Sequence, residues 1–177
     1  MIWLGAIVLG AAFGLATGGK LTNLGKVRFR WPWIVVAVIL VRFLVLSTPL
    51  NSVEGAQYLY VLALAVIVGW TAWHLNRVRG IWLISAGAAL NLIVILVNRG
   101  HMPVAPELAT SMGGRATVGQ YTVMSSQTNL NILGDWIKLG PIPEAYSLGD
   151  VLIAVGLAIV VFLAIRNPSA YEGVSPP

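Results

Sequence analysis

The amino-acid sequence predicts an all-α integral membrane protein, a bundle of five transmembrane helices in a single domain over residues 1–177. Hydrophobic residues make up 58% of the chain and charged residues only 10%, whereas soluble domains carry about 25% charged residues. The apolar residues also come in blocks, each close to the roughly 20 residues that cross about 30 Å of hydrocarbon. A single soluble core could not bury so much apolar surface.

Recognisable residues mark the ends of the five predicted spans. The spans cover residues 2–18, 31–47, 57–75, 81–98 and 148–165. Pro32 lies just inside the second span, where its missing N–H costs no helical hydrogen bond. Ser147 and Asp150 have the spacing of a capping box, which places a carboxylate at the positive end of the last helix.

Basic residues predict the orientation of this bundle. Of the eleven Lys and Arg residues, seven fall in short segments on one predicted side of the membrane. The positive-inside rule assigns that side to the cytoplasm, so the N-terminus lies outside and the C-terminus inside. No basic residue precedes the first apolar block, which is therefore interpreted as a retained helix and not as a cleaved signal peptide. The predicted location is the cytoplasmic (inner) membrane of a bacterium.

Composition limits the available chemistry. The chain has no cysteine, which excludes disulfides, thiolate metal sites, iron–sulfur clusters and cysteine nucleophiles. The two histidines, His74 and His101, are predicted at opposite faces of the membrane, so a two-histidine metal site is not expected. The net charge of +5 is confined to segments between apolar blocks, where membrane orientation explains it better than nucleic-acid binding. We therefore expect no metal and no nucleic acid as partners.

Small residues recur along the first span. Ala6, Gly10, Gly14 and Gly18 stand at every fourth position and would share one face of a helix. Such a stripe lets another backbone approach closely, which matters in lipid because apolar side chains gain little by leaving apolar tails. The expected neighbour is another span of the same chain, and a partner subunit is the alternative.

Polar residues within the spans need compensation. Arg42 lies inside the second span, where an arginine at the centre costs about 2.5–3.5 kcal/mol on insertion scales. Its side chain either extends toward the outer headgroups or pairs with an acid on that side. The acids considered are Glu54, Asp135 and Asp150. Asn91 and Asn98 share one face of the fourth span, and we expect them to form hydrogen bonds across helices.

Residues 99–146 form the one long connection and are predicted to lie outside. Within it, the stretch TNLNILGDWIKLG carries Leu130, Leu133, Trp136 and Ile137 at helical spacing. This pattern predicts a short helix that lies in the outer interface or caps the bundle. Packing on the protein itself is the preferred interpretation.

The junction VILVNRGHMPVAP ends the fourth span. Pro103 disfavours a helix at the preceding residue, and Gly100 allows the unusual backbone of a sharp exit. Arg99 would lie at headgroup depth, where a cation is tolerated. His101 could carry a proton or act as a ligand. It could also join Asp135 and either Ser111 or Ser125 in a catalytic set, but no nucleophile-elbow pattern frames either serine. Helix exit explains most of the junction without chemistry.

Three segments, NRGHMPV, TNLNILGDWI and YSLGDVLIAVG, follow four apolar spans in that order. Together they resemble an uncharacterised family of small bacterial multi-pass membrane proteins. Its pattern combines an Asn-x-Gly-x-Met-Pro exit, a Leu-Gly-Asp step and a Ser-x-Gly-Asp start of the last span. The matching residues are Asn98, Gly100, Met102, Pro103, Leu133, Gly134, Asp135, Ser147, Gly149 and Asp150. The resemblance covers mainly the C-terminal half and implies a fold and an outer-face feature, but no activity.

The sequence favours a role without catalysis. Small size and faces rich in small residues point to an accessory or structural subunit of a larger membrane complex, with energy-transducing (respiratory or photosynthetic) complexes as the class considered. The alternatives are a membrane enzyme acting on lipid or quinone at the outer face, and a small transporter. Expected partners are membrane lipids and other membrane subunits, and contact with a pigment or quinone stays open. The outer-face candidates are Arg42, Asn91, Asn98, Arg99, His101, Asp135 and Asp150.

Overall fold

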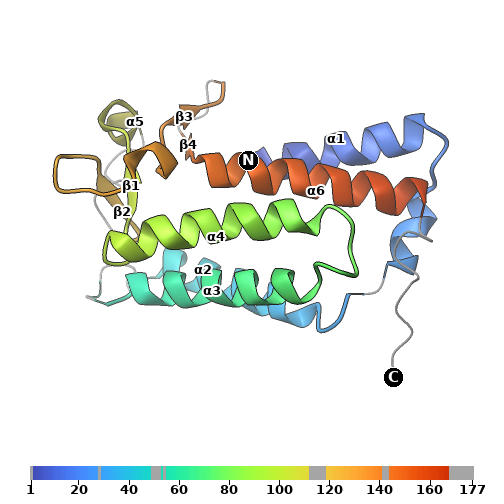
Figure 1. The fold of residues 1–177 in the computed structure, drawn as a ribbon, viewed down its shortest axis with the longest axis horizontal. Coiled ribbons are helices and arrows are strands. Elements are labelled where there is room, and N and C mark those ends of the chain that lie inside the picture. Colours follow the sequence, from blue (N-terminus) through green and yellow to red (C-terminus); the bar gives the residue numbers. More distant parts are fainter. Residues whose placement is uncertain are drawn as a thin grey trace.

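A computed structural model of the chain describes residues 2–27, 29–48, 53, 55–111, 119–140 and 144–167. Over these ranges the fold is mostly helical, as the sequence predicted (Figure 1). The long helices run side by side, and the short elements gather at one end. The long helices are α1 (Ile2–Ala16), α2 (Trp33–Ser47), α3 (Gln57–Trp73), α4 (Ile81–Val97) and α6 (Leu148–Arg166).

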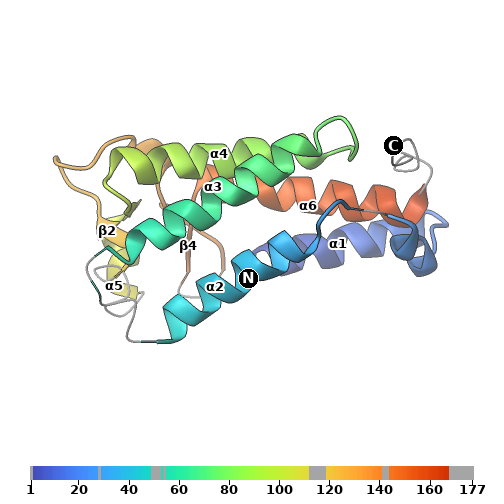
Figure 2. The same ribbon diagram turned by 90° about the horizontal axis from the view of Figure 1, so that it is seen from below.

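The long helices pack in the order α1, α6, α4, α3, α2, which differs from their order along the chain (Figures 1 and 2). α6 therefore lies between α1 and α4, although it comes last in the sequence. α2 is peripheral and packs mainly against α3 (Figure 2). The middle of the bundle is thus built by α6 and α4.

In the described part of the chain, one helix is long and apolar enough to cross a membrane, judged by length and composition: α6, with 19 residues. The other apolar helices are shorter, at 15 to 17 residues. At about 1.5 Å per residue they reach about 22 to 26 Å, somewhat less than the about 30 Å of a typical hydrocarbon core. Among the described helices, only α6 therefore reaches the length of a typical membrane span.

Helix ends follow the predicted signals. α3, α4 and α6 begin at the predicted residues, and α2 begins directly after Pro32. The capping box is confirmed: the Asp150 N–H donates to Ser147 Oγ over 3.0 Å, and the Ser147 N–H donates to Asp150 Oδ2 over 3.1 Å. These bonds satisfy two amide groups that a helix start leaves without intrahelical partners.

α1 packs along α6 through small residues. Ala6, Gly10 and Gly14 are buried, and a Cβ on Gly10 would lie 3.0 Å from the Ala158 Cα atom of α6. The stripe does not reach Gly18, contrary to the prediction. α1 ends at Ala16, and Gly18 adopts a φ of +86° in an exposed turn, which takes it off the helical face.

Short strands and helices form one end of the molecule, called the loop end below (Figure 1). The sequence predicted an all-α chain and missed the strands, which are two or three residues long. The strands pair in two small sheets, β1 with β2 in parallel and β3 with β4 in antiparallel orientation. The elements are β1 (Met102–Val104), α5 (Pro106–Ser111), β2 (Tyr121–Val123), the 3-10 helix η4 (Asn131–Leu133), β3 (Ile137–Lys138) and β4 (Ala145–Tyr146).

The helix predicted from Leu130, Leu133, Trp136 and Ile137 is wrong. Leu130 has a left-handed φ of +55°, and only η4 is helical before the chain extends into β3. The Asp135 amide and carbonyl groups bond to the segment around β1, so they are not available for an i to i+4 ladder. Long-range backbone pairing has overridden the local apolar spacing here.

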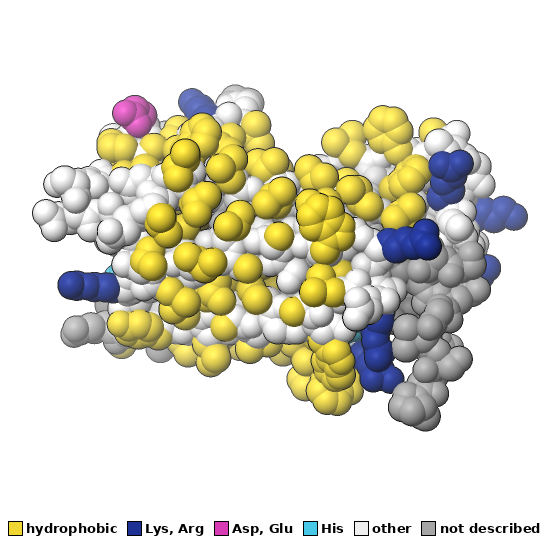
Figure 3. All heavy atoms as spheres, viewed as in Figure 1, with side chains coloured by type: hydrophobic (Ala, Val, Ile, Leu, Met, Phe, Trp, Pro, Cys, Tyr) yellow, Lys and Arg dark blue, Asp and Glu magenta, His cyan; other side chains and the backbone are white. Residues whose placement is uncertain are grey.

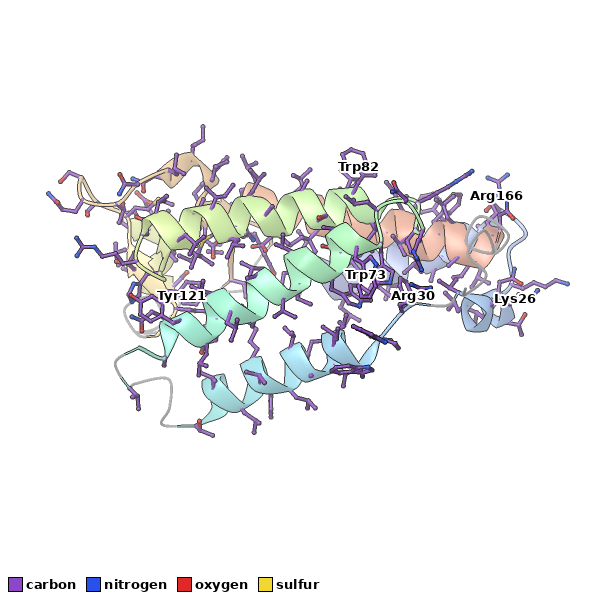
Figure 4. All side chains as sticks on the ribbon, turned by 60° about the horizontal axis from the view of Figure 1, so that its bottom comes forward. Lys26, Arg30, Trp73, Trp82, Tyr121 and Arg166 are labelled. Atoms are coloured by element: carbon purple, nitrogen blue, oxygen red, sulfur yellow. The ribbon has the colours of Figure 1, made fainter. Side chains whose placement is uncertain are left out.

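The opposite end, called the basic end below, holds the 3-10 helix η1 (Leu21–Lys26) and the turn between α3 and α4. Lys26, Arg30 and Arg166 come from three different segments and lie together at this end, with Trp73 and Trp82 further along the bundle (Figure 4). Tyr121 lies at the loop end (Figure 4). The structure thus separates a basic, tryptophan-rich end from an end made of loops.

Apolar side chains cover the surface between the two ends, while Lys and Arg side chains gather mainly at one end (Figure 3). On α1 and α2, for example, Leu4 is 61% exposed and Phe43 is 63% exposed. Helices that are apolar around their whole circumference are typical of a lipid-facing or partner-facing position. Exposure to water of this apolar surface between the two ends, called the apolar belt, is unfavourable.

Candidate functional site

β1 forms the centre of the loop end. It follows the exit from α4 and pairs in parallel with β2, so that Met102 lies opposite Tyr121 and Val104 opposite Val123. Backbone bonds flank this pairing: the Met102 N–H donates to the Gln120 carbonyl over 2.7 Å. All three β1 residues are buried. A segment predicted only as the end of a span is therefore a buried strand.

The other edge of β1 is held by Asp135. The Asp135 N–H donates to the Pro103 carbonyl over 2.8 Å, and the Ala105 N–H donates to the Asp135 carbonyl over 2.9 Å. Gly134 comes so close that a Cβ there would lie 2.7 Å from the Pro103 carbonyl oxygen. The Met-Pro and Leu-Gly-Asp segments, which are about thirty residues apart in the sequence, thus meet directly.

The Asp135 side chain is buried by this arrangement. It is 4% exposed, and its Oδ1 atom is buried without a hydrogen-bond partner among the described residues. Burial raises the pKa of the Asp135 carboxyl well above its ordinary value, the charge of Asp150 raises it further, and the charge of Arg42 opposes both. A buried acceptor without a donor is costly, and such a group is a candidate for function.

Charged and phenolic groups act electrostatically on Asp135 or are acted on by it. Arg42, from α2, is half-buried, and its guanidinium carbon lies 5.9 Å from the centroid of the Tyr60 ring on α3. Burial raises the pKa of Tyr121 to about 12, and the charge of Asp135 adds to this. Glu54, one of the partners considered for Arg42, lies outside the described residues. The residues that act on one another here are named the outer cluster: Arg42, Tyr121, Asp135 and Asp150.

Hydrogen bonds join α4 to α6 at the outer cluster, through its member Asp150. Asn91 Nδ2 donates to Asp150 Oδ1 over 3.1 Å, and Ser147 Oγ donates to Asn91 Oδ1 over 2.8 Å. The helices approach closely because Gly87 and Gly149 face each other, and a Cβ on Gly149 would lie 2.6 Å from the Gly87 carbonyl oxygen. Asn91 therefore bonds across helices, and both carboxylate oxygens of Asp150 accept hydrogen bonds.

Asn98 connects the end of α4 to the loop before η4. Its Nδ2 donates to the Asn129 carbonyl over 2.9 Å, and its Oδ1 accepts the Asn129 N–H over 2.8 Å. The chain then turns through two left-handed residues, with φ of +57° at exposed Arg99 and +91° at buried Gly100. A Cβ on Gly100 would lie 2.6 Å from Gln57 Cγ, so both space and backbone favour glycine there.

His101 is half-buried, and its Nδ1 atom lies 3.4 Å from the Asn98 carbonyl oxygen. The serines considered as nucleophiles have other partners: Ser111 Oγ donates to the Leu108 carbonyl, and Ser125 Oγ accepts the Gln127 N–H. The described residues show no bond that links either serine to His101. Nor does the described part of the chain contain a group of three or more His, Asp or Glu residues placed to hold a metal ion.

A second buried polar group, His74 at the basic end, has a hydrogen-bond partner for each ring nitrogen. His74 is 1% exposed. Its Nε2 accepts the Arg30 N–H over 3.1 Å, and its Nδ1 lies 2.7 Å from the Trp70 carbonyl oxygen, so that Nδ1 donates in the neutral ring. Trp70 Nε1 in turn donates to the Arg30 carbonyl over 2.9 Å. This set of three residues is named the His74 clamp.

The family comparison matches most of the chain. Residues 26–162 match a family of unknown function, DUF5317. The chain belongs to this family. The matched range contains β1, Asp135 and the start of α6, so the outer cluster lies wholly within the region that defines DUF5317. Comparisons with curated proteins and with solved structures gave no match.

Sequence reasoning identified some members of the outer cluster and missed others. Arg42, Asp135 and Asp150 were singled out, but Tyr121 and the buried Gln120 were not. Tyr121 occurs in the polar stretch GQYTVMSS, and its position opposite Met102 follows from strand pairing, for which a three-residue strand gives little signal. The environment of a half-buried tyrosine is recognisable only once its neighbours are known.

Proposed function

We propose that this chain is a five-span protein of the bacterial cytoplasmic membrane, with its N-terminus outside, and that it serves as an accessory subunit of a larger membrane complex. The apolar belt between a basic end and a loop end supports the membrane assignment. Lys and Arg at the basic end agree with a cytoplasmic position, and Trp73 and Trp82 agree with an interfacial belt. The loop end, with the outer cluster, then faces the outside.

The observation that carries the subunit assignment is the position of α2. This helix packs mainly against α3, and it exposes the large side chains Val36, Ile39, Leu40, Phe43 and Leu44. The small residues of α1 are already used against α6. Helix association in lipid depends on close packing and polar contacts, so a peripheral helix with one main neighbour offers its remaining face to a partner helix.

The enzyme alternative has weaker support. It needs a reactive group that meets substrate at the outer face, and His101 was the main candidate. In the described residues, the His101 ring contacts the Asn98 carbonyl and shares no hydrogen bond with Asp135. A catalytic pair requires that bond or a bridging substrate. The accessory role therefore remains the proposal.

Co-purification tests the subunit assignment. The native protein, extracted in mild detergent, is expected to migrate on native gels with other membrane polypeptides, which mass spectrometry then identifies. Ala37→Trp places a bulky apolar ring on the exposed face of α2, where lipid tolerates it and a packed partner helix does not. This variant should lose the partners. Ala12→Trp, on an exposed position of α1, is the matched control and should retain them.

Migration of the native protein as a lone monomer would overturn the subunit assignment, and so would equal behaviour of the two tryptophan variants. The membrane assignment has its own test, because the chain has no cysteine and each introduced thiol is unique. Glu107→Cys in α5 should react with an impermeant thiol reagent added to intact cells. Arg77→Cys should react only after permeabilisation. Labelling of both in intact cells, or of neither, would refute the orientation.

A further inference from the structure

We propose that the outer cluster is a binding site for one exchangeable monovalent positive charge, a proton or an alkali cation, with Asp135 as the acceptor. The observation behind this proposal is the Oδ1 atom of Asp135, which is buried without a hydrogen-bond partner among the described residues. It belongs to a side chain that is 4% exposed. The site goes beyond the accessory role and does not depend on it.

The charges of the cluster set the sign of the ligand. When ionised, Asp135 and Asp150 contribute two negative charges and Arg42 contributes one positive charge, so that the cluster carries a net charge of −1. A buried net charge is costly, and binding of one positive charge removes it. A second anion would increase the imbalance. The ligand is therefore a single positive charge.

The hydrogen bonds of the cluster decide which carboxylate accepts it. Asp150 Oδ1 accepts from Asn91 Nδ2, and Asp150 Oδ2 accepts from the Ser147 N–H. Arg42 stands against the Tyr60 ring. Of these two carboxylates, only that of Asp135 has an oxygen without a donor among the described residues, and its backbone is fixed on both sides by the segment around β1. The carboxyl is thus held in place by its main chain while its oxygen remains free to bind.

Proton and alkali cation share this chemistry and compete for one oxygen, so the two sources are separated by experiment. The full chain in lipid nanodiscs is unfolded thermally at pH 8.5 while NaCl or KCl is added, with N-methylglucamine chloride at equal ionic strength as the reference. An alkali-cation site gives a saturable rise in Tm with NaCl or KCl only. A proton site gives no such rise, but Tm increases as the pH is lowered.

Variants assign the effect to the cluster. Asp135→Asn should abolish whichever dependence the wild type shows, whereas Glu107→Gln, which removes an exposed carboxylate of α5, should leave it intact. Arg42→Gln removes the compensating positive charge, so the cation concentration for half-maximal stabilisation should fall roughly tenfold, or the proton should be held to higher pH. A dependence that persists in Asp135→Asn would overturn the proposal, as would the absence of any dependence in the wild type.

A measurement on the wild type alone covers the case in which Asp135→Asn does not fold. Infrared difference spectroscopy follows the C=O band of a protonated carboxyl group. In alkali-free buffer the proposal expects one buried carboxyl whose band is present in acid and disappears as the pH is raised. For an alkali-cation site, the cation added at constant pH should also remove the band. A spectrum without such a band at any pH at which the protein is folded would refute the proposal.

Discussion

His74 at the basic end and Asp135 at the loop end are both almost fully buried, at 1% and 4% exposed. They differ in their hydrogen bonds. Both ring nitrogens of His74 have backbone partners within 3.1 Å, while Asp135 Oδ1 has none among the described residues. A satisfied buried group stabilises one conformation, whereas an unsatisfied one adds a cost that folding alone does not explain. His74, which the sequence analysis did not single out for chemistry, is thus a structural residue, and the unsatisfied group is Asp135.

The largest expected effect concerns the His74 clamp. His74→Leu leaves the half-buried Arg30 amide without its acceptor and removes the donor to the Trp70 carbonyl. A fully buried polar group that loses its partner costs about 1 to 3 kcal/mol, and these two groups are only partly buried, so we expect a loss of about 2 to 4 kcal/mol in the free energy of unfolding. Chemical or thermal unfolding in detergent measures it. Leu75→Ala, at the exposed neighbouring position, should change stability by less than about 0.5 kcal/mol.

Asp135→Asn should change the stability in the opposite direction to His74→Leu. Because the folded-state pKa of Asp135 is raised above its ordinary value of 3.8, the folded protein retains a proton that the unfolded chain releases. The stabilisation that comes from this retained proton is therefore complete in acid, and it is lost as the pH rises from about 4 through the folded-state pKa. In buffer without alkali cations, the asparagine variant should remove this slope and raise Tm at pH 8. A lower Tm at pH 8 in that buffer would show that the protein itself stabilises the ionised carboxylate, and the contrast with His74 would fail.

Asn98→Ala should have a smaller and local effect. It removes the paired bonds to the Asn129 main chain, which should cost about 1 to 2 kcal/mol. Amide hydrogen exchange should be faster around Asn129 and unchanged at the basic end. Asn76→Ala, at an exposed position beside the His74 clamp, serves as the control. Faster exchange at both ends would mean that the two regions unfold as one unit.

The smallest effect at neutral pH is expected for Tyr121. Burial raises the pKa of its phenol to about 12, so between pH 10 and 12 the unfolded chain ionises while the folded protein keeps the proton. Stability should fall across that window. Ultraviolet titration of the wild type should show late-ionising tyrosines, because the pKa values of Tyr121 and Tyr146 are both raised to about 12, and Tyr121→Phe should make the late step smaller by one tyrosine. If the late step is the same size in the variant, Tyr121 does not ionise late.

The helices could be predicted because their signals are local. Pro32 and the Ser147–Asp150 capping box act within one helical turn, and both boundaries follow them. The segment around Trp136 was assigned wrongly for the converse reason. Its apolar spacing is local, but its conformation is set by Asp135 bonding to the main chain of Pro103 and Ala105, far away in the sequence. No side-chain pattern within the segment encodes that partner.

The candidate site was predicted in composition but not in arrangement. Asn91, Asp135 and Asp150 were recognised as polar residues near one membrane face, which follows from span topology alone. That Asn91 bonds to Asp150 depends on the close approach of Gly87 and Gly149. That Asp135 has a free oxygen depends on how the loop packs, which no residue type determines. Such properties arise from tertiary contacts, and residue types alone do not predict them.

The pairing of α1 with α6 has a consequence for biosynthesis. Gly10 and Gly14 lie against Ala158 and Ile165, and the Lys20 N–H donates to the Ile165 carbonyl over 3.0 Å. During translation, the face of α1 that carries Gly10 and Gly14 leaves the ribosome long before α6, which covers it, has been synthesised. Until then, that face lacks the helix that covers it in the folded protein. The nascent chain therefore completes its native packing only after about 165 residues have been translated.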